Sequence, residues 1–174
     1  MNKSQPEPWL RGTHSEIPAV PRAVLHGIKL AQEDLTFWCG ELSEQELFAT
    51  PSGLPSIAFH LRHIARSLDR LLTYAEGHPL SERQLQALNS EAESRCSRAE
   101  IFSELSAAFT ETSARILKLS EKLDTLNRSR TVGRRNLPTT VAGLLVHIAD
   151  HTQRHVGQAI TTAKVLIAHR GQNL

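Results

Sequence analysis

Long apolar runs are absent from this sequence of 174 residues. The longest is VAGLLV, residues 141–146, whereas a membrane-spanning helix needs about 20 consecutive apolar residues. The N-terminal stretch MNKSQPEPWLRGTHSEIP has no apolar segment and no cleavage-site pattern, which excludes a secretory signal. We therefore expect a cytoplasmic protein without a membrane partner, with a flexible N-terminal segment at residues 1–17.

Cysteine and net charge are also scarce. The two cysteines, Cys39 and Cys96, form no C-x-x-C pair, so neither a disulfide framework nor a thiolate metal site is indicated. We expect both thiols to be buried. Lys and Arg number 20 against 18 Asp and Glu, and a nearly neutral chain has no general attraction for nucleic acid.

One basic stretch, NRSRTVGRRN, departs from this balance. No aromatic residue is interleaved with its arginines, so stacking on a single-stranded nucleic acid is not supported. We expect an exposed, mobile loop, with an anion-binding rim at the mouth of a pocket or a contact to nucleic acid as alternatives. The arginines of this stretch are Arg128, Arg130, Arg134 and Arg135.

Apolar residues spaced three and four apart mark four amphipathic helices of about 20 residues. No run of alternating strand pattern accompanies them, so we predict an all-α protein, a four-helix bundle, in a single domain over residues 18–170. The connections at residues 43–54 and 81–89 are each expected to hold a short helix. The four long helices are placed after Pro18 and Pro21 and up to Gly40, between Pro55 and Gly77, after the capping box Ser97–Glu100, and from Pro138 onward.

Nine histidines are present, and several fall at helical spacing. In VHIADHTQRHVGQ, His147, His151 and His155 are four residues apart, and FHLRH places His60 and His63 beside the apolar stripe of the second helix. Imidazoles at i and i+4 can chelate one ion, and His63 on a different inward-facing helix favours a shared divalent cation. The other four histidines, expected to be solvated or bonded to backbone carbonyls, are His14, His26, His78 and His169.

A shared cation also explains how several imidazoles lie near a core. Each buried polar group without a partner costs about 1–3 kcal/mol, and a cation removes that cost by binding the neutral ring nitrogen. Closed structural zinc sites use four protein ligands, whereas three ligands leave a position for water or substrate. The histidine pattern therefore predicts an open metal site.

The two histidine segments resemble motifs of the DinB superfamily, the DinB/YfiT-like metalloenzymes. HTQRHVGQ is similar to its H-x-x-x-H-x-G-Q signature. SIAFHLRHIARSLDRLL resembles its second helix, in which a histidine and an apolar-small pair precede a serine and an acidic residue. The resemblance covers roughly residues 20–168. It implies that His63, His151 and His155 bind a divalent metal ion, with zinc or nickel most expected.

The resemblance also suggests supporting residues. Gly157 would let a neighbouring element approach the fourth helix closely, and Gln158 would position water or an imidazole. His60 and His147 are extra to the usual triad. We expect them to support the ligands from behind, with extra ligands or cavity wall as the alternatives.

One basic side chain is a candidate for holding a cofactor. Arg70 lies two turns after His63 on the same row of the second helix and would anchor a small anionic cofactor, or it is a solvated surface arginine. The family often has a basic residue directly after the last histidine. This chain has Val156 there, so no anion contact is expected from that position.

The resemblance favours a metal-dependent enzyme acting on a small-molecule substrate. Some relatives use a low-molecular-weight thiol such as bacillithiol or mycothiol as nucleophile, and an open cation lowers the pKa of a thiol. Hydrolysis would need a nearby general base, but Asp150 and Asp69 point away from the histidine rows. We therefore favour thiol-dependent S-transfer over hydrolysis as the reaction.

The other alternative is a metal-binding stress-response, sensor or interaction protein without turnover. Members of the family are often dimers, so we expect a homodimer.

Overall fold

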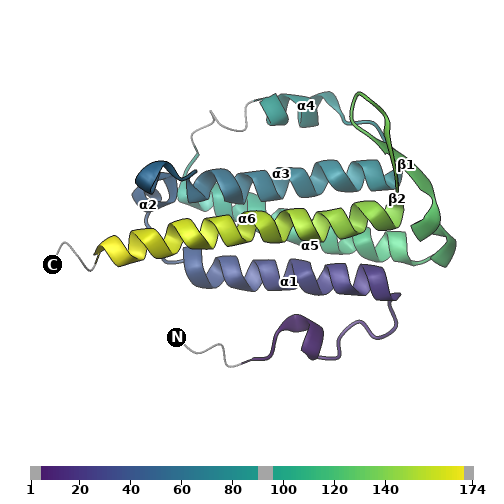
Figure 1. Ribbon diagram of the computed structural model, residues 1–174, viewed down its shortest axis with the longest axis horizontal. Helices are drawn as coiled ribbons and strands as arrows, with labels where there is room; N and C mark the ends of the chain where they lie inside the picture. Colours follow the sequence, from purple (N-terminus) through teal and green to yellow (C-terminus); the bar gives the residue numbers. More distant parts are fainter. Residues whose placement is uncertain (1–4, 90–95, 171–174) are drawn as a thin grey trace.

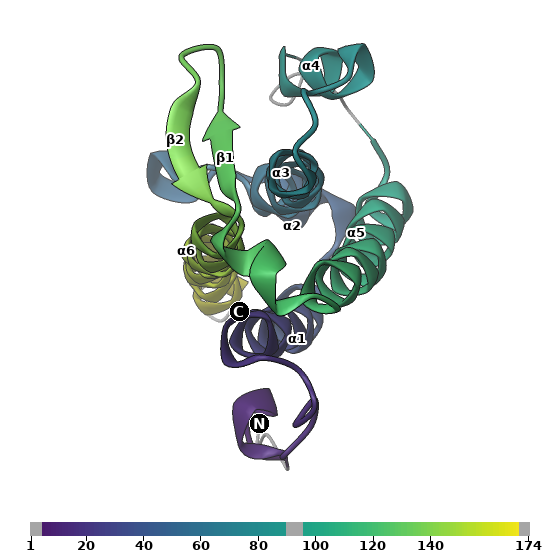
Figure 2. The same ribbon diagram turned by 90° about the vertical axis from the view of Figure 1, so that its right-hand side faces the viewer.

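Four long helices form the body of the computed structural model, which describes residues 5–89 and 96–170. They are α1 (Ala19–Cys39), α3 (Ile57–Glu76), α5 (Arg98–Ser120) and α6 (Val141–Arg170). The helices run side by side along the molecule (Figure 1) and surround a common core in the order α1, α5, α3, α6 when seen end-on (Figure 2). This arrangement confirms the predicted all-α fold.

Short helices occupy the connections, as the sequence predicts. The segment after α1 holds α2 (Glu44–Phe48) and the 3-10 helix η2 (Pro51–Gly53), and the segment after α3 holds α4 (Glu82–Asn89). A capping box starts α2, because the Ser43 hydroxyl accepts from the Glu46 amide and the Glu46 carboxylate accepts from the Ser43 amide. α4 lies outside the bundle, beside α3 (Figures 1 and 2).

A two-stranded hairpin stands where the sequence predicts an exposed loop. After the 3-10 helix η3 (Leu123–Asn127), β1 (Ser129–Val132) pairs antiparallel with β2 (Leu137–Thr140). The chain reverses through Gly133 and Asn136, whose φ angles of 70° and 50° lie in the left-handed region that these residue types tolerate. The loop prediction is wrong because four-residue strands are too short to show a clear alternating pattern.

Two helix starts differ from the predicted ones. Pro138, expected to open the last long helix, lies in β2, and α6 begins after Thr140. The Thr140 Oγ1 sets this start by accepting a hydrogen bond from the Gly143 amide at 3.0 Å. α1 begins earlier than predicted, at Ala19. Pro21 lies in its first turn, where a missing amide costs no intrahelical hydrogen bond.

The described part of the N-terminal segment precedes α1 in the sequence and lies alongside it in space (Figure 1). It holds the 3-10 helix η1 (Pro8–Leu10). The Arg11 guanidinium then donates two hydrogen bonds to the Glu33 carboxylate of α1, at 2.7 and 2.8 Å. The flexibility expected of residues 1–17 stays a prediction, and residues 1–4 lie outside the described residues.

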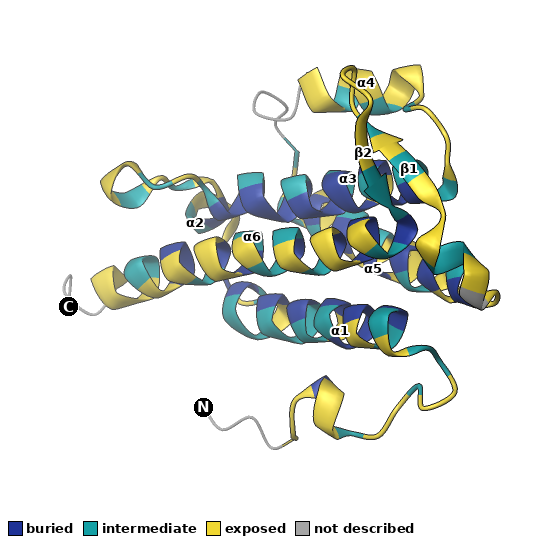
Figure 3. Cartoon of the chain, turned by 45° about the vertical axis from the view of Figure 1, so that its right-hand side comes forward, coloured by how far each residue is buried: buried dark blue, intermediate teal, exposed yellow. Residues whose placement is uncertain are grey.

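The core includes many of the apolar residues whose three-and-four spacing predicted the long helices. Leu35, Leu61, Ile116 and Ile148 come from the four long helices and are at most 1% exposed. Burying each such side chain contributes about 1.5–3 kcal/mol. Buried residues face inward on these helices, whereas α4 is largely exposed (Figure 3). None of the helices in the described ranges is both long and apolar enough to cross a membrane.

The two cysteines differ in burial. Cys39 is fully buried, as predicted, and this burial raises the pKa of its thiol to about 12. Cys96 is only half-buried, so the prediction is wrong for this thiol. The reason is its position in the connection before α5, where Ser97 caps the helix, and not on an inward helix face.

Candidate metal centre

Three imidazoles from two packed helices converge between α3 and α6. His63 comes from α3, and His151 and His155 come from α6. One ring nitrogen of each lies within 4.8 Å of the others, and the Nε2 atoms of His63 and His151 are 3.4 Å apart. Two nitrogens bound to one tetrahedral zinc at about 2.0–2.1 Å are separated by roughly 3.4 Å. The spacing of this pair therefore suits a single cation.

The imidazoles of His151 and His155 are neutral at pH 7. Burial, followed by the charge of His63, lowers the pKa of His151 to about 4. The same two causes lower the pKa of His155 to about 4. A neutral imidazole keeps a ring-nitrogen lone pair free for a cation, whereas an imidazolium does not. The protonation state thus fits metal binding.

Two ring nitrogens of the cluster are buried without a hydrogen-bond partner among the described residues. They are the Nδ1 of His151 and the Nε2 of His60. Buried polar atoms are usually paired, so these two atoms are exceptions within the part of the chain that the structure describes. An unpaired Nδ1 on His151 also leaves its Nε2 as the atom that faces His63.

His60 lies directly behind His155. It is 2% exposed, and its Nδ1 is 3.1 Å from the Nδ1 of His155. Two neutral imidazoles at this distance share one proton, because two lone pairs facing each other would repel. When His155 donates that proton, its Nε2 is left to bind a cation. The structure therefore brings His60 to the cluster, on the side away from His151.

His147 and Gln158 lie farther from the centre. The His147 side chain is about half exposed, its ring centroid is 5.5 Å from that of His151, and its Nδ1 is 3.8 Å from the Asp150 carboxylate. Gln158 is exposed. The supporting roles suggested for these two residues stay predictions.

The close approach expected at Gly157 is not found among the described residues. A Cβ added at Gly157 would meet nothing within 4 Å, so that prediction is wrong. At Gly27 of α1, an added Cβ would lie 3.7 Å from the Ala149 Cβ of α6. The Gln153 side chain of α6 also donates to the Gly27 carbonyl at 2.8 Å. α1 and α6 therefore pack closely here, although a Cβ at Gly27 would make only an ordinary van der Waals contact.

A cavity of about 210 Å³ opens beside His63 and His151. Its wall includes Arg70, Tyr74 and His147. Arg70 is 9% exposed, which excludes a solvated surface arginine and places its charge at the cavity. Its role as an anchor stays a prediction.

No Asp or Glu is among the described residues that line this cavity. The two carboxylates nearest in sequence to the histidines are engaged elsewhere. Asp150 accepts from Arg154 at 2.6 Å, and Asp69 accepts from Arg115 at 2.8 Å and from Gln84 at 2.7 Å. Asp69 therefore points away from the histidines, as the helical spacing predicts, whereas Asp150 pairs with Arg154 and lies near His147 without lining the cavity.

Five of the described lining residues were not predicted from the sequence as parts of a site. Ser67, Leu71 and Tyr74 come from α3, Leu80 from the connection before α4, and Leu88 from α4 itself. The only sequence signal for the α4 leucine is the spacing of Leu85 and Leu88, three residues apart on a short helix. That signal cannot tell which part of the bundle the leucines face.

Of the comparisons with known proteins, a search of the curated proteins finds no match to the chain. A comparison with family models does find one, and it agrees with this geometry. The family model described as the DinB superfamily matches residues 28–159, more than half of the chain. The match includes all three histidines of the cluster, which fits a metal-binding member of that family. The chain therefore belongs to the DinB superfamily.

Proposed function

We propose that this protein is a metal-dependent enzyme that binds one divalent cation through His63, His151 and His155. The observation that carries the proposal is the convergence of these three imidazoles beside a cavity. Three protein ligands leave at least one position for a small molecule. Zinc or nickel is the proposed ion, because imidazole suits both.

Thiol-dependent S-transfer is the reaction that these residues favour. A divalent cation supplies the positive charge that lowers the pKa of a thiol or a water molecule. The thiol sulfur would form a bond to an electrophilic carbon of the substrate, and the leaving group would depart with the electrons of its own bond while the thiol proton goes to solvent. Arg70 would hold an anionic part of the thiol, and His60 would orient His155.

The cavity composition separates this reaction from hydrolysis. Activation of water benefits from a carboxylate or another base within hydrogen-bond reach, and no Asp or Glu is found among the described lining residues. A low-molecular-weight thiol needs less help, because its proton is lost much more readily than that of water. Metal-dependent hydrolysis is therefore the less favoured reaction.

A second candidate function is metal binding without turnover. The observation that favours it is the presence of two further imidazoles beside the triad, His60 at 3.1 Å from His155 and His147 on the cavity wall. As a fourth protein ligand, either would close the coordination sphere. Such a protein would act as a metal sensor, a stress-response protein or an interaction module. A small-molecule substrate and a homodimer stay predictions.

Metal content tests the proposal directly. The protein is purified without a histidine tag or chelator and analysed by mass spectrometry, beside His63→Ala and His151→Ala variants. We expect about one divalent ion per chain, lost in both variants. His169→Ala, which changes an exposed histidine at the end of α6, is the matched control and should keep the metal.

Two results would contradict the proposal. One is a protein without metal that binds none of added zinc, nickel or manganese. The other is metal that remains in His63→Ala and His151→Ala alike. If metal binds as expected, a screen of low-molecular-weight thiols with an electrophile such as 1-chloro-2,4-dinitrobenzene separates enzyme from sensor. Only the enzyme gives a rate that disappears on removal of the metal.

A further inference from the structure

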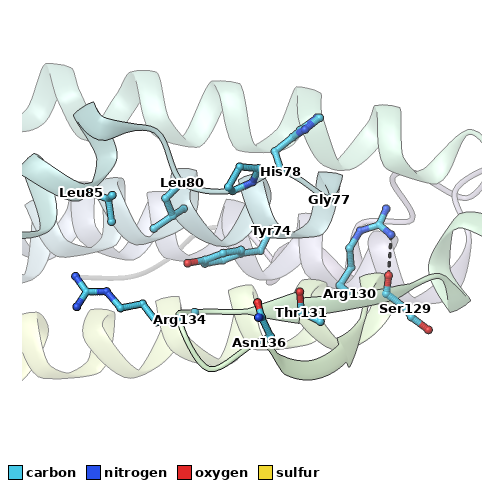
Figure 4. A pocket seen from close by; sticks show the side chains of 12 residues that line it. Tyr74, Gly77, His78, Leu80, Leu85, Ser129, Arg130, Thr131, Arg134 and Asn136 are labelled. Carbon is cyan, nitrogen blue, oxygen red and sulfur yellow. Dashed lines mark hydrogen bonds between the residues drawn. The ribbon is translucent and has the colours of Figure 1, made fainter.

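The cavity beside the histidines adjoins a larger cavity under the hairpin. The hairpin cavity has a volume of about 600 Å³, within the range of about 300–1,000 Å³ typical of small-molecule sites. Tyr74 and Leu80 line both cavities. Figure 4 shows the hairpin cavity between the α3–α4 connection and the two strands. Tyr74 and Leu80 therefore form a wall that the two cavities share.

The hairpin is fixed in place by Arg130. Its Nε donates to the Ala75 carbonyl in the last turn of α3, at 2.8 Å, and its Nη1 donates to the Ser129 carbonyl at 2.8 Å. The guanidinium also packs on Gly77, whose φ of +88° ends the helix. The Arg130 guanidinium thus already donates to two carbonyl oxygens, one of them in the last turn of α3, although its positive charge remains. A residue without such partners is better placed to meet the charge of a ligand.

Arg134 is that residue. It comes from the turn of the hairpin and lines the same cavity. Within residues 5–89 and 96–170 its guanidinium takes part in no hydrogen bond or ion pair. In Figure 4 the Arg134 guanidinium and the Tyr74 hydroxyl are directed toward the same end of the cavity. Both groups can donate a hydrogen bond to a ligand in this cavity.

The charged side chains that line the two cavities are all positive. Arg70 lines the histidine cavity, and Arg130 and Arg134 line the hairpin cavity. Neither wall has an Asp or Glu among its described residues. A concave surface with positive charges and no carboxylates attracts anions and repels cations. The ligand is therefore expected to carry a negative charge.

The middle of the two cavities is apolar. Leu85 of α4 lines the hairpin cavity and Leu88 lines the histidine cavity. These leucines are 40% and 43% exposed, and no residue of α4 is buried. Because they are three residues apart, they share one face of the helix. An apolar face turned over two cavities suits the apolar body of a ligand.

We propose that the two cavities form one binding site for an elongated, anionic small molecule with an apolar middle. Its carboxylate or phosphate contacts Arg134, its apolar part lies between Tyr74 and the leucines of α4, and its other end reaches His63 and His151. The last contact rests on the proposed function, since it places the reacting end of the ligand at the metal. The first two contacts rest on the cavity alone.

Matched probes test the charge requirement. Binding of 6-phenylhexanoate, 6-phenylhexyl phosphate and 6-phenylhexylamine to the zinc-loaded protein is measured by isothermal titration calorimetry. Both anions should bind, and the tighter of the two identifies the preferred anion. The amine, which has the same apolar body and the opposite charge, should bind at least about tenfold more weakly.

Adjacent arginines provide a matched pair of variants. Arg134→Gln should weaken the anions about tenfold, because a charge-assisted hydrogen bond is lost. Arg135→Gln removes the same charge from the next residue of the turn, which is exposed and lies outside both cavity walls. It should leave the anions bound as before. Equal binding of amine and anions, or equal weakening in both variants, would overturn the proposal.

Orientation is tested with paramagnetic Mn²⁺ in place of zinc. The phenyl protons of 6-phenylhexanoate should relax faster than the protons beside its carboxylate, because the carboxylate lies at the hairpin and the ring at the histidines. The reverse order would mean that the carboxylate binds the metal, which contradicts the proposed site. Zinc-loaded protein gives the diamagnetic reference.

Metal content keeps the two proposals separate. If the protein binds metal and none of the anions, the elongated site is wrong and the metal proposal stands. If anions bind in an Arg134-dependent manner to a protein that takes up no metal, the hairpin end of the site stands and the metal proposal fails.

Discussion

The imidazoles of His151 and His155 are neutral because they are buried beside other histidines. The pKa of each is lowered to about 4, against about 6.5 in an unfolded chain. Between these values the unfolded chain binds more protons than the folded chain, so the free energy of unfolding rises with pH. Their contribution to stability is complete above about pH 6.5 and is lost as the pH falls through about 4.

We therefore expect the metal-free protein to lose stability between pH 6.5 and pH 4.5. Urea unfolding in the presence of a chelator, followed by circular dichroism, measures this loss. The double variant His151→Gln, His155→Gln should have a flatter dependence over the same interval, because two of the titrating groups are gone. Parallel curves for the variant and the native protein would show that these histidines do not titrate as stated.

The thiol of Cys39 should be inert in the folded protein. Burial raises its pKa to about 12, so almost no thiolate forms at pH 8, and the side chain is 0% exposed. Cys96 is half-buried, and burial raises the pKa of this thiol too. Cys96 should therefore react slowly with Ellman's reagent, and Cys39 only after unfolding. The Cys96→Ser variant isolates Cys39, and a prompt reaction in that variant would contradict the prediction.

Substitution by alanine should change the free energy of unfolding in opposite directions at two helix glycines, Gly77 and Gly157. Gly77 ends α3 with a φ of +88°, and an added Cβ would lie 3.4 Å from the Arg130 guanidinium. Gly77→Ala should lower the free energy of unfolding by about 1–2 kcal/mol, the cost of a left-handed alanine. Gly157 lies inside α6 with open space around it. Gly157→Ala should raise the free energy of unfolding by about 0.5–1 kcal/mol, the helix propensity gain.

Urea unfolding measures both changes under the same conditions. Loss of stability in Gly157→Ala would mean that a neighbouring element does approach α6 at this glycine. An unchanged stability in Gly77→Ala would mean that α3 can end without its left-handed residue, and the position of the hairpin would then not depend on Gly77.

Helices and their ends were largely predictable because their signals are local. The three-and-four spacing of apolar residues placed all four long helices, and Ser97 with Glu100 fixed the start of α5. The hairpin was missed because its strands are four residues long and are held by tertiary contacts such as Arg130 to the Ala75 carbonyl. Such contacts join residues far apart in the sequence, so no local pattern records them.

The candidate site divides in the same way. His63, His151 and His155 follow helical spacing and could be predicted as neighbours once α3 and α6 were known to face the core. The leucines of α4 on the cavity walls could not, because the placement of that short helix depends on packing. The sequence shows Arg134 only as part of a basic stretch. Its position at a cavity could not be predicted, because that position depends on the hairpin.

At the scale of the whole molecule, the metal site joins two helices that are remote in the sequence. A cation bound to α3 and α6 together stabilises the folded chain and has no such site in the unfolded chain. At a free zinc concentration about 100 times the dissociation constant, the gain is about 2.7 kcal/mol. For a chain of this size that raises the melting temperature by about 5–10 °C.

Thermal unfolding followed by circular dichroism measures this shift with zinc, with magnesium and with a chelator. Zinc should raise the melting temperature, and magnesium should not, because it prefers oxygen ligands to imidazole. In His63→Ala the zinc shift should be lost, since the remaining imidazoles of the triad both belong to α6 and no longer link it to α3. A zinc shift that persists in this variant would place the ion on a single helix or elsewhere, and the link between α3 and α6 would have to be explained by packing alone.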